Sequence, residues 1–190
     1  MGSTTETSLH FVTDARASQF TAQAFSGGLL SAFGHNPTIA IRDFTAEAEI
    51  NPDDIERSSV KVTIKTDSLT VRDNISDKDR REMERTMREE ILEIASFPEI
   101  VYECSSIAAS RTGEGEYQVT LNGELTLHGI TRSQAVSARV VLSEDSLRAF
   151  GEFSIRQTEY ALKLASVAGG SLKLKDELKC SFNILARKKE

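Results

Sequence analysis

The stretch EYQVTLNGELTLHGITRSQAV, residues 116–136, decides the fold class of this chain. Through its first half, apolar side chains recur at every second position, opposite a polar face. This two-residue period predicts a β-strand with one buried and one solvated face. The apolar face carries Tyr117, Val119, Leu121, Gly123, Leu125 and Leu127. His128 and Gly129 interrupt the pattern, so we expect a tight connection that delivers Thr131 and Arg132 to the next strand.

The same alternation occupies most of the chain. It recurs in residues 17–25, 38–50, 59–69, 99–107, 134–142, 147–155 and 177–186. A change of parity near Arg42 and Asp43 predicts a bulge or bend. Seven to nine antiparallel strands with one apolar face predict a mainly β protein and a closed barrel. Gly123 and Gly151 fall on the apolar face, where glycine permits a sharp bend or leaves space for a ligand.

Two segments depart from the strand period. Residues 77–94 place apolar side chains at helical spacing among many charges, and Ser76 with Asp79 resembles a capping box. This predicts a surface helix over about residues 77–94. The glycine-punctuated stretch near residues 27–33 has space for a second, short helix.

Length and charge limit the classes of function. A chain of 190 residues predicts one domain, placed at residues 9–187, with residues 1–8 and 188–190 as flexible termini. A net charge of −6 disfavours nucleic acid as a partner. The sequence contains neither a secretory signal pattern nor an integral membrane segment, so we expect a cytoplasmic protein.

Catalytic and metal-binding signatures are weak. The spacing of His10, His35 and His128 matches no metal motif, and the sequence contains no nucleophile elbow or phosphate-binding loop. We therefore expect no metal and no cofactor. Cys104 and Cys180 lie among apolar residues in strand patterns and are interpreted as buried thiols.

Five segments together resemble the YceI family. Along the chain they are FGHNPTIAIRDFTAEAEI, VKVTIKTDSL, FPEIVYECSSI, the hairpin at residues 117–136 and AGGSLKLKDELKCSFNILA, and the resemblance runs from about residue 11 to residue 186. The resemblance implies an extended antiparallel, lipocalin-like β-barrel with a helical insertion. It also implies an elongated apolar cavity that holds a polyisoprenoid or similar lipid. Many members of that family carry an export signal and a less charged insertion helix than this chain.

We therefore predict a binding protein rather than an enzyme, with an apolar lipid or isoprenoid chain along the barrel axis. The protein would act as a carrier, scavenger or sensor of that compound. The cavity wall is predicted to include Phe20, Ile39, Ile41, Val62, Ile64, Tyr102, Leu125, Leu127, Phe153 and Phe182. Its mouth is predicted to be closed by Leu29, Leu30, Phe33, Met83 and Met87. His35 is a candidate for a structural hydrogen bond in its loop or for a polar group at the mouth. Arg156 aligns with an arginine of the family and is a candidate salt-bridge partner or headgroup contact.

Two alternatives stay open. An enzyme could use the same cavity with His35 as acid or base. An interaction module could instead fill the barrel with side chains and dock a partner through the charged helix at residues 77–90. A homodimer is also expected, through an exposed strand edge or the helix.

Overall fold

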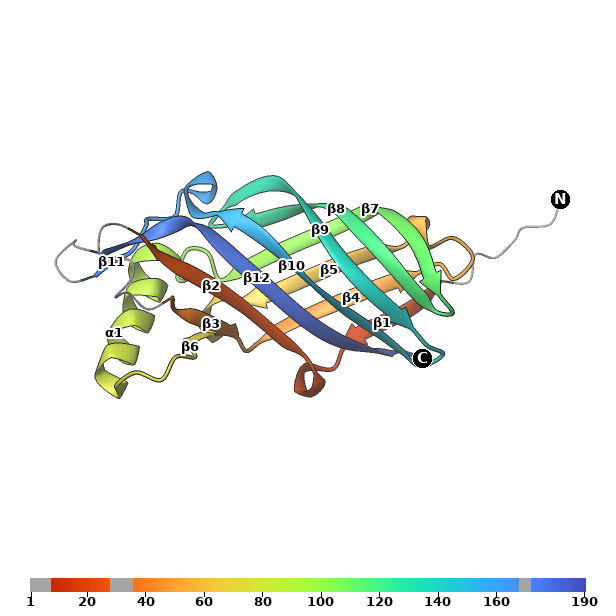
Figure 1. The fold of residues 1–190 in the computed structure, drawn as a ribbon, viewed down its shortest axis with the longest axis horizontal. Helices are drawn as coiled ribbons and strands as arrows, with labels where there is room; N and C mark the ends of the chain where they lie inside the picture. Colours follow the sequence, from red (N-terminus) through yellow and green to blue (C-terminus); the bar gives the residue numbers. More distant parts are fainter. Residues whose placement is uncertain (1–7, 28–35, 168–171) are drawn as a thin grey trace.

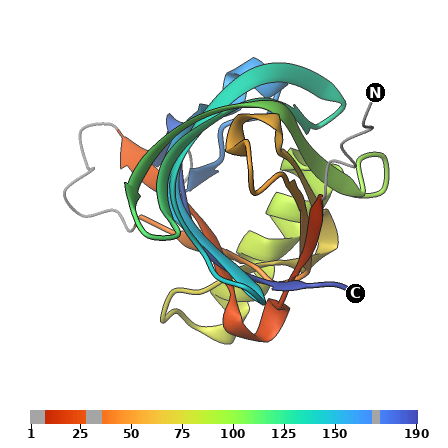
Figure 2. The ribbon, with the colours of Figure 1, turned by 90° about the vertical axis from the view of Figure 1, so that its right-hand side faces the viewer.

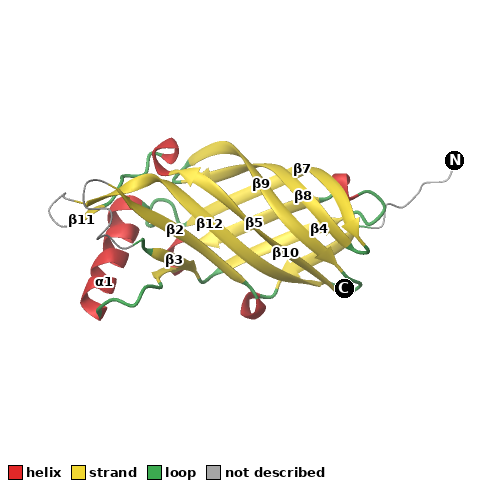
Figure 3. Cartoon of the chain, viewed as in Figure 1, coloured by secondary structure: helices red, strands yellow, loops and turns green. Residues whose placement is uncertain are grey.

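The computed structural model describes residues 8–27, 36–167 and 172–190, and strands form most of it (Figures 1 and 3). Most of the short helix predicted near residues 27–33 falls outside the described residues, and Gly27 ends a strand. The strands are β1 (Leu9–Thr13), β2 (Gln19–Gly27), β3 (Thr38–Ile41), β4 (Phe44–Ile50), β5 (Ser59–Lys65), β6 (Leu69–Val71), β7 (Glu99–Gly113), β8 (Glu116–Leu127), β9 (Ile130–Leu142), β10 (Ser146–Arg156), β11 (Ser166–Val167) and β12 (Leu172–Lys188). The helical segments are α1 (Asp77–Thr86), the π-helical turn η5 (Met87–Ile91) and the 3₁₀ turns η1 (Ala15–Ala17), η3 (Ile55–Arg57), η4 (Thr66–Ser68) and η6 (Gln157–Tyr160).

The strands form one antiparallel sheet that closes on itself. Its order is β1-β4-β5-β7-β8-β9-β10-β12-β2-β3-β6, and β1 also pairs with β12. The pairs β1 and β2, β3 and β4, and β5 and β6 each behave as one interrupted strand, so the ring has eight strands. Viewed along its length in Figure 2, the ring surrounds the barrel axis with α1 beyond its far end. The predicted mainly β, lipocalin-like barrel is confirmed.

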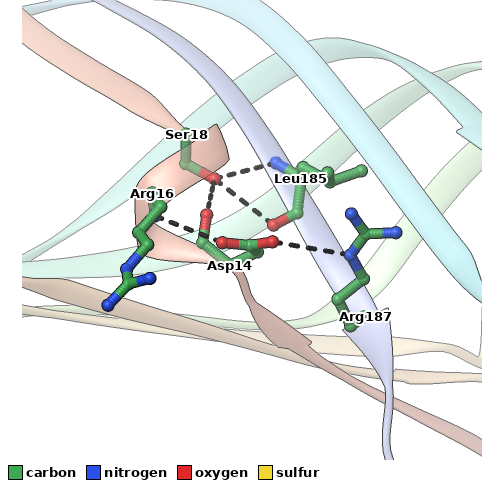
Figure 4. Close-up of polar contacts among 5 residues, drawn as sticks. All are labelled: Asp14, Arg16, Ser18, Leu185 and Arg187. Carbon is green, nitrogen blue, oxygen red and sulfur yellow. Dashed lines mark hydrogen bonds and ion pairs between the residues drawn. The ribbon is translucent and has the colours of Figure 1, made fainter.

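At the break between β1 and β2, the Ser18 hydroxyl and the Asp14 backbone make hydrogen bonds that hold the chain against β12 (Figure 4). Ser18 Oγ donates to the Asp14 carbonyl at 2.7 Å and accepts the Leu185 N–H of β12 at 2.9 Å. The Asp14 N–H donates to the Leu185 carbonyl at 2.7 Å, and the Asp14 carboxylate accepts from Arg187 Nε at 3.5 Å. These bonds keep the backbone groups of β12 paired, so the wall stays closed where the strand is interrupted.

The predicted break of parity near Arg42 and Asp43 is confirmed. β3 ends at Ile41 and β4 begins at Phe44, and both of these side chains are buried. At the far end of the barrel, β12 remains paired with β1 as far as Lys188, one residue beyond the predicted end of the domain.

The predicted surface helix is present but changes its geometry before it ends. Ser76 Oγ caps α1 by accepting the Asp79 N–H at 3.1 Å, as the capping pattern predicts. After Thr86 the chain forms the π-turn η5, in which the Leu92 N–H donates to the Met87 carbonyl at 2.8 Å. This extra residue in the turn shifts the helical register, and Leu92, which is not part of the predicted apolar stripe, lies in the core and is 7% exposed.

Charged side chains of the helix bind the backbone of β6. Arg80 donates to the Val71 carbonyl, and the Glu84 carboxylate accepts the Val71 N–H at 2.9 Å. Arg88, one further turn along, donates to the Leu69 carbonyl at 3.1 Å. β6 pairs with β3 on its other side, so this stripe of charged residues takes the place of a neighbouring strand.

Gly123 gives the first test of the fold, because Tyr102 lies across it. A Cβ at Gly123 would lie 2.5 Å from the Glu103 carbonyl oxygen and 2.6 Å from Tyr102 Cζ. We expect Gly123→Ala to lower the free energy of unfolding by about 1–3 kcal/mol through overpacking, measured by urea denaturation. Gly113→Ala is the matched control, since its Cβ would meet nothing closer than 3.5 Å. Equal stability of the two variants would contradict the close packing of Tyr102 over Gly123.

Candidate ligand-binding cavity

A cavity of about 230 Å³ lies inside the barrel. Its lining reaches from Ile55, in the turn η3 at one end, to Leu92, behind the π-turn at the other. An engineered apolar cavity of about 150 Å³ is large enough to bind benzene. The barrel therefore has internal space for part of an apolar molecule and is not filled by its own side chains.

Most of the predicted wall residues line this cavity. The predicted residues found in the lining are Phe20, Ile41, Val62, Ile64, Tyr102, Leu125, Leu127, Phe153 and Phe182. Strand alternation places all of them on the interior face, as the sequence pattern predicts.

Other predicted residues lie elsewhere. Ile39 packs against the core but is not in the lining. Met87 also packs against the core without reaching the cavity, and Met83 is half-buried on α1. Arg156 is exposed at the end of β10, opposite Glu177 of β12. Leu29, Leu30, Phe33 and His35 lie outside the described residues.

Several residues of the cavity wall are not among those predicted from the sequence. Leu121, Val136, Leu178, Cys180 and Ile184 follow the same alternation as the predicted ones, so the strand period could have found them. Leu92 could not be found in this way. It enters the cavity wall only because η5 is a π-turn, and the helical spacing had favoured Met83 and Met87 instead.

Four phenylalanine rings form an aromatic cluster, and three of them, Phe20, Phe153 and Phe182, line the cavity. The ring centroid of Phe20 lies 5.7 Å from that of Phe44, 6.5 Å from that of Phe153 and 6.2 Å from that of Phe182. All three contacts are edge-to-face, the arrangement that aromatic quadrupoles favour. Rings locked in this way give part of the cavity a fixed, apolar shape.

Two polar side chains of the lining, Tyr102 and Ser58, are bonded to the protein itself. The Tyr102 hydroxyl lies 3.1 Å from the Leu121 carbonyl and 3.0 Å from the Gln134 carbonyl, which accept its hydrogen bond. Burial raises the pKa of this hydroxyl far above its usual range, so it stays protonated. Ser58 Oγ accepts the Asn51 N–H at 3.0 Å. Among the described residues, the one buried side-chain nitrogen or oxygen without a partner is Arg88 Nε, which is outside the lining.

His128 lies at the α1 end of the barrel, in the tight connection that the sequence predicts. Its φ is +52° and that of Gly129 is +73°, as a two-residue hairpin turn requires. The imidazole also contacts two other segments. Nε2 lies 2.7 Å from a carboxylate oxygen of Glu93, and Nδ1 lies 3.2 Å from the Tyr160 carbonyl oxygen. His128 is therefore more than a turn residue, because it joins three parts of the chain.

No group of three or more His, Cys, Asp or Glu side chains that could hold a metal ion occurs in residues 8–27, 36–167 and 172–190. Over the same ranges, none of the helices has the length and hydropathy needed to cross a bilayer.

Comparison with known proteins agrees with this architecture. Residues 6–186 match the family described as the YceI-like domain. The chain belongs to the YceI-like family. No curated protein matches it.

Solved structures with the YceI-like barrel are distant in sequence but similar in fold. BcnA of Burkholderia cenocepacia is 18% identical, with a TM-score of 0.71 over 91% of this chain and 98% of that one. A polyisoprenoid-binding domain from Saccharophagus degradans is 15% identical, with a TM-score of 0.67 over 95% and 98%. The YceI protein of Campylobacter jejuni is 14% identical, with a TM-score of 0.57 over 80% and 85%.

The two cysteines provide a chemical test of how closed the barrel is. Both thiols are buried, and burial raises the pKa of Cys180, in the cavity wall, to about 12. Because the thiolate is the reactive form, we expect neither cysteine to react with Ellman's reagent at pH 8 in the native protein. Both should react once the protein is unfolded in guanidinium. Rapid modification of one thiol in the native state would contradict the closed wall.

Proposed function

We propose that this protein binds a lipid or isoprenoid-like apolar chain inside its barrel, as a carrier, scavenger or sensor of that compound. The observation that carries the proposal is the composition of the cavity wall, in which hydrocarbon side chains and aromatic rings dominate and the Tyr102 and Ser58 hydroxyls are already hydrogen-bonded. Each polar group of a ligand that is buried there without a hydrogen-bond partner costs roughly 2–7 kcal/mol. An apolar chain carries no such cost.

Burial of hydrocarbon supplies the binding energy in this proposal. Each buried methylene contributes about 0.8 kcal/mol, so one five-carbon isoprene unit contributes roughly 3–4 kcal/mol. Two or three buried units reach micromolar affinity after the ordering costs of several kcal/mol. A charged headgroup would stay at an end of the barrel, because its desolvation among Phe20, Phe153 and Phe182 would outweigh this gain.

Membership of the YceI-like family supports the same proposal, as does the fold that the chain shares with the polyisoprenoid-binding domain of Saccharophagus degradans. A cytoplasmic location, a homodimer and a headgroup contact by Arg156 stay predictions.

The alternative of an interaction module has less support. It requires a barrel filled by side chains, whereas the barrel encloses about 230 Å³. It also requires a helix whose charges are free for a partner, whereas Arg80, Glu84 and Arg88 bind the backbone of β6. The enzyme alternative depends on His35, which lies outside the described residues.

A pair of adjacent substitutions tests the site. Leu121 points into the cavity and Asn122, its neighbour on β8, is exposed on the outer face. Leu121→Phe adds three carbon atoms to the wall and displaces ligand volume, so we expect all-trans-retinol, an uncharged isoprenoid alcohol, to bind about 30-fold more weakly. The measurement is a fluorescence titration with retinol for both variants and the unmodified protein.

Asn122→Phe is the matched control and should bind retinol like the unmodified protein, because the same ring then lies outside the barrel. Equal weakening by both substitutions would place the ligand elsewhere. Failure of the unmodified protein to bind retinol and long-chain fatty alcohols would contradict the proposed function.

A further inference from the structure

At the α1 end of the barrel, a short segment with unusual backbone geometry contributes to the cavity wall. Leu92 reaches the cavity wall from the π-turn, and the next residue, Glu93, has a φ of +47°. The chain then turns back, and the Phe97 N–H donates to the Glu93 carbonyl at 3.0 Å. We call residues 92–97 the sealing turn, because Leu92 at its start forms this end of the cavity.

The sealing turn is attached to the barrel through His128. The imidazole contacts the Glu93 carboxylate through Nε2 at 2.7 Å, and its centroid lies 4.4 Å from that of the Phe97 ring. Gly129 allows this approach, since a Cβ there would lie 2.7 Å from Phe97 Cε1. The His128 side chain is only 11% exposed, so water competes weakly for its two nitrogens.

Both ring nitrogens of His128 face groups that only accept hydrogen bonds. Nε2 faces the Glu93 carboxylate and Nδ1 faces the Tyr160 carbonyl, at 2.7 and 3.2 Å. A neutral imidazole has one N–H and one lone pair, whereas the imidazolium has two N–H groups. Both bonds therefore form together only when His128 carries a proton. After loss of that proton, one nitrogen presents its lone pair to an oxygen, and the contact becomes repulsive.

We infer that His128 is a proton-controlled latch on the sealing turn, so that the cavity is held shut at low pH and opens more readily as the pH rises. Histidine is the side chain whose ordinary charge change falls between pH 5 and 8. Regulation of ligand exchange by this latch rests on the proposed function, but movement of the sealing turn does not.

The charged surroundings fit this assignment. Glu93 is the carboxylate on the sealing turn, and the neighbouring charged side chains on β9 and η6 are Arg132 and Glu159. Arg132 Nε donates to the Glu159 carbonyl at 2.7 Å. The Tyr160 hydroxyl does not titrate in the same range, because burial raises its pKa above the ordinary value.

Amide hydrogen exchange tests the latch without any ligand. The Leu92 and Phe97 amides report on the sealing turn, because each donates to a carbonyl of that segment or of η5. After correction for the intrinsic pH dependence of exchange, we expect their protection to fall about 3- to 10-fold between pH 6 and pH 8, as expected for loss of a partly exposed charge-assisted bond. His128→Gln keeps an amide donor for Glu93 at every pH, so its protection should not change over this range.

Two further variants separate this latch from other histidines. Glu93→Gln offers an amide N–H to the lone pair of neutral His128, so its protection should hold or rise as the pH increases. His10→Gln is the matched control, because His10 also pairs with a carboxylate, that of Glu49, but lies at the opposite end of the barrel. It should keep the unmodified pH profile, as should His35→Gln. The latch would be overturned if protection of the Leu92 and Phe97 amides still fell with pH in His128→Gln, or if it did not fall in the unmodified protein.

Ligand exchange gives the second measurement. The rate of retinol transfer to phosphatidylcholine vesicles should rise about 3- to 10-fold from pH 6 to pH 8 in the unmodified protein and stay constant in His128→Gln. Retinol is uncharged throughout this range, so the change reports on the protein. A pH-dependent sealing turn in a protein that binds no retinol would retain the latch and reject the proposed function. Retinol binding with a pH-independent sealing turn would retain the proposed function and reject the latch.

Discussion

The pairing of β1 with β12 is the contact on which the cavity depends, because it turns an open sheet into a ring. It is short, with Phe11, Val12 and Thr13 opposite Lys188, Arg187 and Ala186. After β1 the strand is interrupted. There the Ser18 hydroxyl donates to the Asp14 carbonyl and accepts the Leu185 N–H of β12, in place of backbone hydrogen bonds. An open sheet would expose both an unpaired edge and the apolar face that lines the cavity, and both promote aggregation. Closure by local hydrogen bonds therefore makes a large apolar interior compatible with a folded monomer.

The helical insertion lies at the opposite end of the barrel from the start of β1 and the end of β12 (Figure 1). Its charged stripe binds the backbone of β6, and its π-turn presents Leu92 to the interior. The helical insertion thus covers the edge of β6 and contributes Leu92 to the cavity wall. The number of charges in this helix, which had suggested a docking surface, has a structural reason in the unpaired backbone groups of β6. Beyond that stripe, exposed Arg85 pairs with Glu89 and Glu90.

Much of this architecture could be predicted from the sequence, because strand alternation is a strong signal. It placed Val62, Tyr102 and Leu125 on the interior face and located the break before Phe44. Events that depend on tertiary contacts could not be predicted. Leu92, and not the predicted Met83, lines the cavity because the helix ends in a π-turn. Helical periodicity in the sequence does not indicate that turn. The same holds for His128, since its spacing to Glu93 and Tyr160 acquires meaning only when the barrel brings three segments together.

Native mass spectrometry of gently purified protein, followed by solvent extraction and lipid analysis, would show whether the interior of this barrel holds an apolar chain. We expect a bound species at about one per chain, lost on extraction and composed mainly of hydrocarbon. A mass that corresponds to the polypeptide alone, in a protein that also fails to take up an added polyprenyl alcohol, would contradict it.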